Sequence, residues 1–246
     1  MDKFSLKGKA ILVTGASSGI GRAIAISCAD AGANVILTGR NMLRLEETLR
    51  MMRDVAKHHI ISADLTDTAQ RQSLAEQIST LDGVVHCAGI GSRVLSKMLE
   101  PDDVQHVMEI NFNAPVLLQA ELLREKKITK EASIIFIAST AATMPSVGNA
   151  IYSASKAALI AYAKCLAQEL AARKIRVNCI SPAMVWTDLA LVGATEEQLR
   201  EAEQAYPLKR YALPEDIAPM AVYLLSEEAA WVTGSNMELT GGTQVL

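Results

Sequence analysis

A phenol and an ammonium four residues apart are the clearest candidates for chemistry in this sequence. Tyr152 and Lys156 occur in the stretch AIYSASKAAL, whose other residues are mostly small. Positions i and i+4 lie on one face of a helix. A phenol with a pKa of about 10 is a poor acid at neutral pH, and a nearby positive charge lowers that pKa. The pair predicts a proton donor beside the group that tunes it, unless the segment is an ordinary amphipathic surface helix.

Two polar residues upstream extend this candidate site. Ser139 ends the apolar run ASIIFIAS and stands 13 positions before Tyr152. At the carboxyl end of a parallel strand, where such sheets bind ligands, its hydroxyl can bond a substrate oxygen that gains charge. Asn111, in MEINFNAP, is expected inside a helix, where an amide among apolar residues is costly unless it is hydrogen-bonded.

A glycine-rich turn near the start offers a place for a phosphate. The first apolar run, KAILVTG, leads into TGASSGIGRAIA, in which Gly15, Gly19 and Gly21 have the spacing G-x-x-x-G-x-G. Glycines allow a tight turn and a close approach of the backbone, and the following helix presents N–H groups to a pyrophosphate. Many turns need glycine, so the turn alone is weak evidence. Its place after the first strand of a β-α series predicts a dinucleotide site.

The residues after the next two apolar runs bear on the choice of cofactor. The second run ends in LTGRN, where an NAD site usually has an acidic residue that accepts a bond from the ribose 2′-hydroxyl. Arg40 cannot accept that bond but can pair with a 2′-phosphate, so NADP(H) is expected and NAD(H) is the alternative. Ser17 and Ser18 can bond the same phosphate, and Asp64 and Leu65 can frame the adenine. The competing interpretations are that Arg40 caps a surface turn and that Asp64 is an ordinary turn residue.

Short apolar runs and segments of helical period alternate along the chain. The expected strands include ANVILTG, HHIISAD, DGVVHCAG, ASIIFIAS and IRVNCISP, and WVTGSNMELTGG adds a last strand. Segments such as GRAIAISCADAG and NMLRLEETLRMMRD have apolar residues at helical spacing. This alternation predicts an α/β fold, a single Rossmann-fold domain over residues 1–246, with a doubly wound parallel sheet and helices on both faces.

One connection is longer than the others in this alternation of strands and helices. Residues 183–207 follow the run IRVNCISP, and within them Thr195 and Gln198 have the spacing of a capping box. Long connections in compact folds often serve as lids over a site. We expect a substrate lid here, with Trp186 and Leu189 giving it an apolar side that faces the substrate.

Composition limits the remaining alternatives. The chain of 246 residues has a formal net charge of −3 and no block of Lys or Arg, so nucleic acid and anionic membranes are not expected partners. No stretch reaches about 18 apolar residues, and the start has no secretory pattern, so a soluble cytoplasmic protein is expected. The four cysteines, Cys28, Cys87, Cys165 and Cys179, lack metal spacing, and we expect free core thiols and no metal site.

These motifs occur together in the order and spacing of a known family. From TGASSGIG through Asn111 and Ser139 to the pair Tyr-x-x-x-Lys, the chain resembles a short-chain dehydrogenase/reductase over essentially its whole length. The resemblance implies that Tyr152 is the general acid/base and that Lys156 lowers its pKa and bonds the nicotinamide ribose. It also implies that Ser139 positions a carbonyl and that Asn111 holds a water in a proton relay to Lys156. The cofactor would supply the hydride.

The same resemblance extends the cofactor site beyond the glycine turn. The stretch SPAMVWTD resembles the family's segment beside the nicotinamide, with Val185 and Thr187 expected at the carboxamide. The full set of expected cofactor contacts is Gly15, Ser17, Ser18, Gly19, Ile20, Gly21, Arg40, Asp64, Leu65, Ala88, Gly89, Tyr152, Lys156, Val185 and Thr187. The expected substrate contacts are Ser139, Tyr152 and Trp186.

Three places depart from the family pattern. His86 and Cys87 stand where an Asn and then an Asn or Ala are usual, Ala183 replaces the Gly of Pro-Gly, and Thr240 replaces an Asp of the tail. The usual Asn ties neighbouring strands together, so His86 must satisfy those bonds in another way. A structural core histidine is favoured over a catalytic one. Ala183 requires an unstrained φ.

The substrate is less clearly indicated. The stretch from YPLKRYALPEDIAP to ELTGG most resembles bacterial 3-oxoacyl-[acyl-carrier-protein] reductases, a likeness shared with many sugar, polyol and steroid dehydrogenases. We expect NADPH-dependent reduction of a 3-oxoacyl thioester, as in fatty acid biosynthesis. The alternatives are a dehydrogenase of a sugar, polyol or other small alcohol, and a non-catalytic dinucleotide sensor, which the intact set of four residues disfavours. An acidic carrier protein would need basic residues near the cleft, and Arg173 matches one family position for such a contact.

By resemblance the protein is expected to be a homotetramer in which the helix with the Tyr-x-x-x-Lys pair packs against its mate. The small residues Ala157, Ala158, Ala161 and Ala163 allow two helices to approach closely. They equally allow close packing on the protein's own sheet, and the sequence leaves these two uses open.

Overall fold

A seven-stranded parallel sheet forms the centre of the structure, a computed structural model that describes residues 3–243. The strands are β1 (Ala10–Thr14), β2 (Asn34–Thr38), β3 (His59–Ile60), β4 (Leu81–His86), β5 (Ile128–Ile137), β6 (Arg176–Pro182) and β7 (Asn236–Leu239). Their order is β3-β2-β1-β4-β5-β6-β7, and every neighbouring pair is parallel. The predicted doubly wound fold is confirmed. The chain reverses its direction across the sheet between β1 and β4, where such sheets open a crevice for a ligand.

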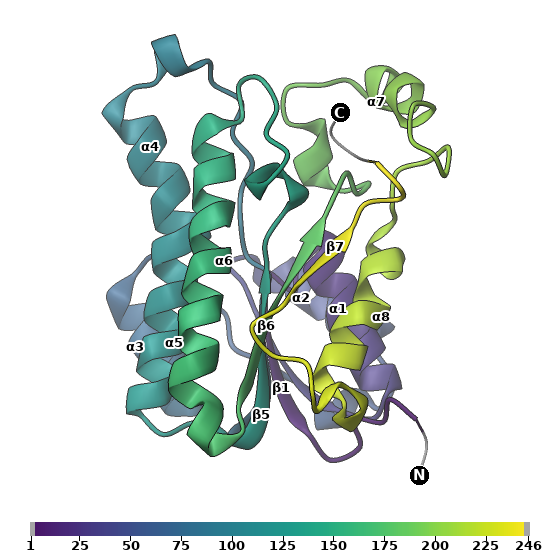
Figure 1. The fold of residues 1–246 in the computed structure, drawn as a ribbon. Helices are drawn as coiled ribbons and strands as arrows, with labels where there is room; N and C mark the ends of the chain where they lie inside the picture. The colour runs from purple at the N-terminus through teal and green to yellow at the C-terminus, as the bar shows by residue number, and fades with distance from the viewer. Residues whose placement is uncertain (1–2, 244–246) are drawn as a thin grey trace.

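Helices cover both faces of the sheet, as Figure 1 shows. One face carries α1 (Gly19–Asp30), α2 (Met42–Met51) and α8 (Pro214–Leu225), and the other carries α3 (Thr68–Gln77), α4 (Pro101–Met108), α5 (Ala114–Arg124) and α6 (Ala150–Leu170). Two clusters of buried aliphatic side chains fill the space between sheet and helices. Because the strands are buried on both faces of the sheet, their sequences are continuous apolar runs. None of the helices in residues 3–243 has the length and apolar character needed to cross a bilayer.

The fifth strand begins earlier than the sequence pattern predicts. The apolar run starts at Ala132, whereas β5 begins at Ile128 and passes through charged residues. Its pairing with β4 shifts between Leu81 and Gly83, and Glu131 has a positive φ of 63°. An irregular strand start with charged residues carries little hydrophobic signal, so periodicity does not reveal it.

Helix α6 divides its residues between the core and the surface. Ala163 and Leu166 are buried against the sheet, whereas Ala161 and Cys165 lie on the outward face and are exposed. All four cysteines are free, but the expectation of a core thiol is wrong for Cys165. The helical period of 3.6 residues turns that position away from the sheet.

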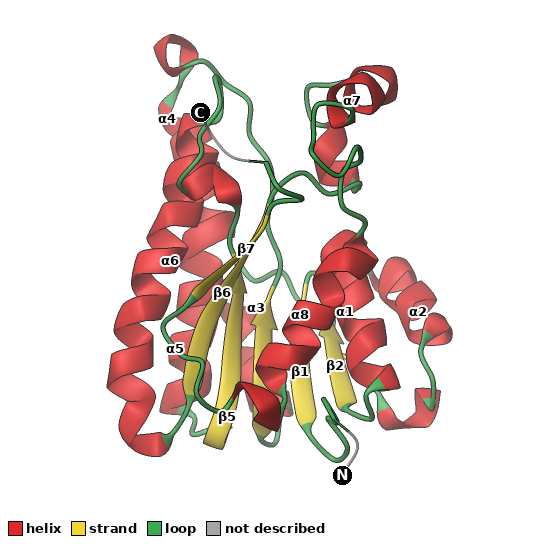
Figure 2. Cartoon of the chain, turned by 45° about the vertical axis from the view of Figure 1, so that its right-hand side comes forward, coloured by secondary structure: helices red, strands yellow, loops and turns green. Residues whose placement is uncertain are grey.

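The connection of residues 183–207, the lid, contains two short helices, η6 (Asp188–Leu191) and α7 (Glu196–Glu203). The predicted capping box is present, because Thr195 and Gln198 each accept a bond from the other's backbone N–H. Where the lid begins, Val185 forms a parallel bridge with Ala212. Figure 2 shows α7 above the sheet, beyond the carboxyl ends of the strands.

Candidate active site

A large cavity opens at the carboxyl edge of the sheet. Its volume is about 1120 Å³, and its walls come from the segments that follow β1, β2, β3, β4, β5 and β6. Pockets for drug-sized ligands usually have volumes of roughly 300–1,000 Å³. The cavity therefore has room for a ligand as long as a dinucleotide together with a small substrate.

The glycine turn between β1 and α1 brings backbone rather than side chains to the cavity wall. Gly15 and Gly19 have positive φ angles of 66° and 50°. A Cβ on Gly15 would lie 2.9 Å from the backbone of Ala88, and one on Gly21 would lie 2.3 Å from the carbonyl oxygen of Gly15. Larger residues do not fit at Gly15 and Gly21, so the turn forms the close-packed cradle that a pyrophosphate requires.

Two side chains hold this cradle against its neighbours. The buried Thr14 hydroxyl accepts hydrogen bonds from the backbone N–H groups of Cys87 and Ala88, at 3.0 and 3.1 Å. Arg22 donates to the carbonyl oxygen of Ser17 at 2.6 Å. The loops after β1 and β4 are thereby joined at the place where the chain changes direction across the sheet.

Arg40 and Asp64 lie together where the loops after β2 and β3 border the cavity. Their closest nitrogen–oxygen distance is 4.0 Å. Asp64 also accepts bonds from the N–H and hydroxyl of Thr66, at 3.0 and 2.8 Å, so it stabilises its own turn while it lines the cavity. The neighbouring Leu65 carbonyl accepts a bond from the buried Arg71 at 2.9 Å. Asp64 is therefore a turn residue that also borders the cavity, and its contact with an adenine stays a prediction.

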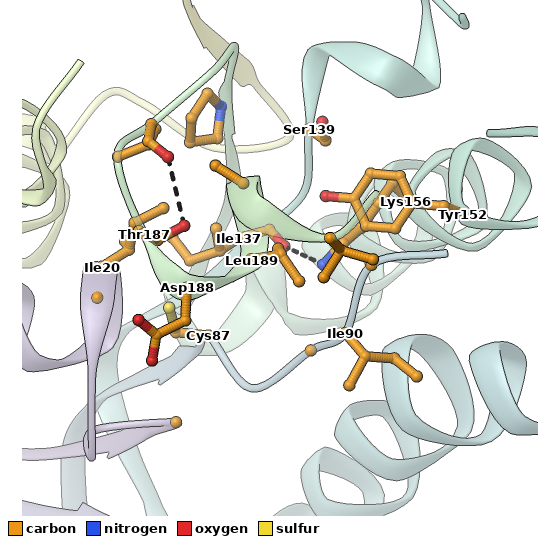
Figure 3. Close-up of a pocket in the computed structure, with 18 of the residues that line it drawn as sticks. Ile20, Cys87, Ile90, Ile137, Ser139, Tyr152, Lys156, Thr187, Asp188 and Leu189 are labelled. Carbon is orange, nitrogen blue, oxygen red and sulfur yellow. Dashed lines mark hydrogen bonds between the residues drawn. The ribbon is translucent and has the colours of Figure 1, made fainter. Parts of the chain in front are cut away.

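Ser139, Tyr152 and Lys156 gather on one wall of the cavity, as Figure 3 shows. Ser139 follows β5, and the other two residues belong to the first turns of α6. Lys156 Nζ lies 5.9 Å from the centre of the Tyr152 ring. Lys156 Nζ also donates to the carbonyl oxygen of Ile137 at 2.9 Å. This bond holds the ammonium beside the phenol.

Burial dominates the acid strength of this pair. Burial raises the pKa of Tyr152 above its ordinary value, and the neighbouring Ser139 hydroxyl opposes the rise. Burial also lowers the pKa of Lys156 to about 8. The lowered Tyr152 pKa expected from Lys156 and the positive ring of the oxidised cofactor is not found in the protein alone, because desolvation outweighs the other effects. Tyr152 is thus a protonated phenol at neutral pH, which is the form that donates a proton.

Asn111 lies behind this wall in a π-helical turn, η3 (Glu109–Asn113), between α4 and α5. Its buried side-chain amide accepts from the N–H of Ile90 at 2.8 Å, and it donates to the carbonyl oxygen of Ile90 at 2.9 Å and to the hydroxyl of Ser155 at 3.2 Å. A Cβ on Gly89 would lie 3.1 Å from Asn111 Oδ1 and 3.4 Å from Lys156 Nζ. Asn111 and Lys156 therefore flank Gly89, and the irregular turn is of a kind that is frequent at functional sites.

Comparison with known proteins identifies the family. A family model described as enoyl-(acyl carrier protein) reductase matches residues 15–244. The chain is 35% identical over 238 residues to 3-oxoacyl-[acyl-carrier-protein] reductase FabG of Rickettsia conorii, covering 96% of this chain and 97% of that protein. A solved structure titled short chain dehydrogenase/reductase family protein superposes with a TM-score of 0.86 at 32% identity, covering 97% of this chain and 98% of that chain. The chain belongs to the short-chain dehydrogenase/reductase family.

Family membership makes the protein an NAD(P)-dependent oxidoreductase, so its cofactor is a nicotinamide dinucleotide. The glycine cradle and the volume of the cavity fit such a ligand. The family includes relatives with other substrates. The L-xylulose reductase of Caenorhabditis elegans is 31% identical over 245 residues, covering 97% of each chain. Similarity alone therefore does not decide the substrate of this short-chain dehydrogenase/reductase.

The residues expected to contact the cofactor all line the one cavity, from Gly15 in the cradle to Thr187 in the lid. Ser139 lines it as well, whereas Asn111 lies behind the wall. These positions are far apart in the sequence. They converge because the carboxyl ends of parallel strands meet at one edge of a sheet.

Trp186, expected to contact the substrate, does not line this cavity. Its indole N–H donates to Glu203 of α7 at 2.9 Å, and its ring packs against Tyr211 with 5.7 Å between ring centres. The guanidinium of Arg200 lies 5.2 Å from the centre of the indole. Trp186 thus anchors α7 to the start of the lid, because the indole finds both a hydrogen-bond partner and apolar contact there. Leu189 does line the cavity, as predicted.

His86 is a core residue, as predicted. Its Nε2 is hydrogen-bonded to Gln119 Oε1 at 3.0 Å, and its ring stacks on Phe136 with 4.6 Å between centres. Burial lowers the pKa of His86 to about 4, so the ring is neutral at physiological pH. Ala183, a second departure from the family pattern, takes no positive φ, as predicted.

The sequence patterns do not point to two charged residues of the cavity wall. Arg44 of α2 and Asp188 of the lid form an ion pair with a distance of 3.3 Å. Arg44 has the pattern of an ordinary exposed position on an amphipathic helix. The folded chain alone brings it to Asp188, which is 144 residues away.

Proposed function

We propose that this short-chain dehydrogenase/reductase reduces the carbonyl of a 3-oxoacyl thioester to a secondary alcohol, with NADPH as the reductant. The observation that carries the proposal is the shared cavity of the glycine cradle and the wall of Ser139, Tyr152 and Lys156. The likeness to a 3-oxoacyl-[acyl-carrier-protein] reductase supports the substrate class. The likeness to an L-xylulose reductase favours the alternative, a dehydrogenase of a sugar or other small alcohol.

The positions of the three wall residues suit a reduction. A nicotinamide cofactor, when bound, would supply the hydride that the carbonyl carbon receives. Ser139 donates a hydrogen bond to the carbonyl oxygen, and Tyr152 transfers its phenolic proton to that oxygen as negative charge develops. The Lys156 ammonium, whose pKa of about 8 keeps it charged at neutral pH, stabilises the phenolate that remains.

Tyr152 must regain its proton before the next turnover. A relay through Asn111 needs a water between its side chain and Lys156. Gly89 lies between these two groups and has no side chain to occupy that space. We therefore retain Asn111 as the residue that holds the relay water.

The preference for NADPH rests on Arg40. The chain continues from β2 through Gly39 to Arg40, so the end of that strand carries no carboxylate to accept a bond from a ribose 2′-hydroxyl. The Arg40 side chain is 66% exposed, and its neighbour Asp64 is 4.0 Å away. A loosely paired guanidinium on the cavity wall is well suited to a 2′-phosphate.

An acyl carrier protein is the proposed partner, but Arg173 is poorly placed to meet it at the cleft of the same chain. Arg173 lies beyond the carboxyl end of α6 and donates to the carbonyl oxygen of Ile128. With 21 residues and about 1.5 Å per residue, α6 separates it by about 30 Å from the end that carries Tyr152. Arg93, which lines the cavity and packs against Gly193 of the lid, offers a positive charge that favours an anionic carrier arm.

A homotetramer remains our proposal for the assembly. Ala157 and Ala161 are exposed on α6 and allow a second helix to approach, whereas Ala163 packs on the protein's own sheet. Light scattering of the purified protein should give four times the chain mass, and a monomer would contradict the proposal.

The direct test mixes the purified protein with an acetoacetyl thioester and follows the loss of reduced-nicotinamide absorbance, with NADPH and NADH in parallel. We expect turnover with NADPH and a loss of about 10²–10⁴-fold in Tyr152→Phe, the usual contribution of a general acid. Turnover of a sugar or polyol in place of the thioester would favour the alternative. Turnover of no carbonyl or alcohol in a broad panel would favour a dinucleotide sensor.

A further inference from the structure

An ion pair spans the cavity from the cofactor-binding side to the lid. Arg44 Nη1 lies 3.3 Å from Asp188 Oδ2, and both residues line the cavity. Arg44 comes from α2, which follows β2, whereas Asp188 comes from η6, which follows β6 at the other side of the sheet. The pair thus connects two walls whose strands are not neighbours.

Arg44 belongs to the same part of the wall as Arg40. The two are four residues apart, with Asn41 between them as the N-cap of α2, accepting a bond from the Arg44 N–H at 3.1 Å. Gly39, Arg40, Asn41 and Arg44 all line the cavity. The place proposed for the 2′-phosphate therefore has two guanidinium groups beside it, and each is near one carboxylate, at 4.0 Å for Arg40 and 3.3 Å for Arg44.

Asp188 belongs to a segment that crosses the cavity. A Cβ on Gly19 of the cradle would lie 3.0 Å from the methyl carbon of Thr187, and one on Gly91 of the loop after β4 would lie 3.1 Å from Leu189 Cδ1. We call residues 187–189 the strap, because they lie close to the loops after β1 and β4. In Figure 3, Thr187, Asp188 and Leu189 follow one another along the pocket. Asp188 is the strap residue through which Arg44 reaches this segment.

The ion pair is weak enough to be exchanged. The side chains of Arg44 and Asp188 are 51% and 78% exposed, and exposed pairs contribute little to stability. A phosphate carries more charge than a carboxylate and has three acceptor oxygens, so it binds a guanidinium more strongly. A 2′-phosphate beside α2 would therefore draw Arg44 away from Asp188.

We propose that Arg44 is a second residue that recognises the 2′-phosphate of NADP(H), and that Asp188 of the strap competes with the phosphate for it. This inference rests on the proposed preference for NADP(H). NADP(H) then exchanges the ion pair and frees the strap from α2, whereas NAD(H), which lacks the phosphate, leaves the pair intact. Selection of the cofactor is thereby coupled to the segment that covers the site.

The test measures binding of NADP⁺ and NAD⁺ by calorimetry, without turnover. Arg44→Gln should weaken NADP⁺ binding by about tenfold, the effect of one charge-assisted bond, and should change NAD⁺ binding by less than about twofold. Asp188→Asn should tighten NADP⁺ binding by about two- to fivefold, because the competitor for Arg44 is removed. When Asp188→Asn is added to Arg44→Gln, it should not tighten NADP⁺ binding further.

Arg50→Gln is the matched control, since Arg50 lies on the same helix, is paired with Glu46 at 3.1 Å and does not line the cavity. It should leave both affinities unchanged. Arg44→Lys, which keeps the charge but not the forked geometry, should fall between the parent and Arg44→Gln.

The outcomes separate this inference from the proposed function. If the parent protein binds NADP⁺ no more tightly than NAD⁺, the proposed preference for NADP(H) fails and this inference fails with it. If the parent discriminates but Arg44→Gln weakens both ligands equally, or neither, the role of Arg44 is refuted while the proposed function stands. If Asp188→Asn gives the same gain with and without Arg44, the competition is refuted. A different carbonyl substrate would change none of these results.

Discussion

The cradle between β1 and β4 and the lid after β6 border one cavity, but they are held in different ways. Cradle contacts are buried and involve the backbone, as where the fully buried Thr14 hydroxyl bonds the loop after β4. On the side that faces α2, the lid is held by an exposed pair of polar side chains, Arg44 with Asp188, whose side chain is 78% exposed. Buried contacts hold a geometry closely, whereas exposed ones exchange at little cost in free energy. The cradle is therefore the more rigid border of the cavity, and the pair at the lid is the border that can change at low cost.

The strictest test of the cradle is Gly21→Ala. The added methyl would lie 2.3 Å from the carbonyl oxygen of Gly15, which is backbone and cannot turn aside. We expect a loss of about 3 kcal/mol in the free energy of unfolding, measured by urea titration. In the control Gly39→Ala the nearest atom is 3.6 Å away, so a change below about 0.5 kcal/mol is expected. Equal effects of the two variants would mean that the cradle is not tightly packed.

The buried His86 should make the free energy of unfolding depend on pH, so that the protein is less stable in acid. Burial lowers the pKa of His86 to about 4, from 6.5 in the unfolded chain, so the unfolded state binds more protons between these values. Stability present above pH 6.5 should fall as the pH drops, by about 2 kcal/mol at pH 5.

The variant His86→Asn introduces the residue that is usual in the family. In this variant the loss of stability between pH 7 and pH 5 should be largely absent. His59→Asn is the control, because His59 is exposed, and it should retain the loss. Urea unfolding at pH 7 and pH 5 measures both. An unchanged acid loss in His86→Asn would show that another group is responsible.

At the rim of the cavity, Arg40→Asp should change the choice of cofactor rather than stability. It removes a cation from the proposed 2′-phosphate site and provides an acceptor for a ribose hydroxyl, so NADPH binding should weaken by about tenfold while NADH binding improves. Fluorescence titration with each reduced cofactor measures the ratio. Arg53→Asp, at an exposed pair with Asp30, is the control. An unchanged ratio in Arg40→Asp would remove Arg40 from cofactor selection.

The smallest effect is expected in the lid. Trp186→Phe keeps an aromatic ring near Tyr211 but removes the N–H that bonds Glu203 at 2.9 Å. Losing one such bond costs about 1 kcal/mol, so KM for the thioester should rise by about three- to tenfold with kcat nearly unchanged. Steady-state kinetics separate the two constants. A large fall in kcat would mean that Trp186 acts on the catalytic wall.

Much of the fold and of the cavity wall could be predicted because the signals are local. Each buried strand is a continuous apolar run, and the cradle is a strand, a turn and a helix in direct succession. The start of β5 could not be predicted from an apolar run, because its residues from Ile128 to Glu131 include charged side chains. The direction of the Trp186 side chain could not be predicted either, because a side chain in a long connection can face the cavity or the rest of the lid. Its hydrogen bond to Glu203 turns it toward the rest of the lid.

The sequence by itself determined the family, the glycine cradle and the pair of Tyr152 and Lys156, because these depend on spacings of a few residues along one helix or turn. The tertiary structure decided the environment of each group. It buries Tyr152 so that its pKa rises, and it stacks His86 on Phe136. It also brings Arg44 to Asp188 across 144 residues. Desolvation and long-range pairing depend on which surfaces meet when the sheet and its helices pack, and no local pattern contains that information.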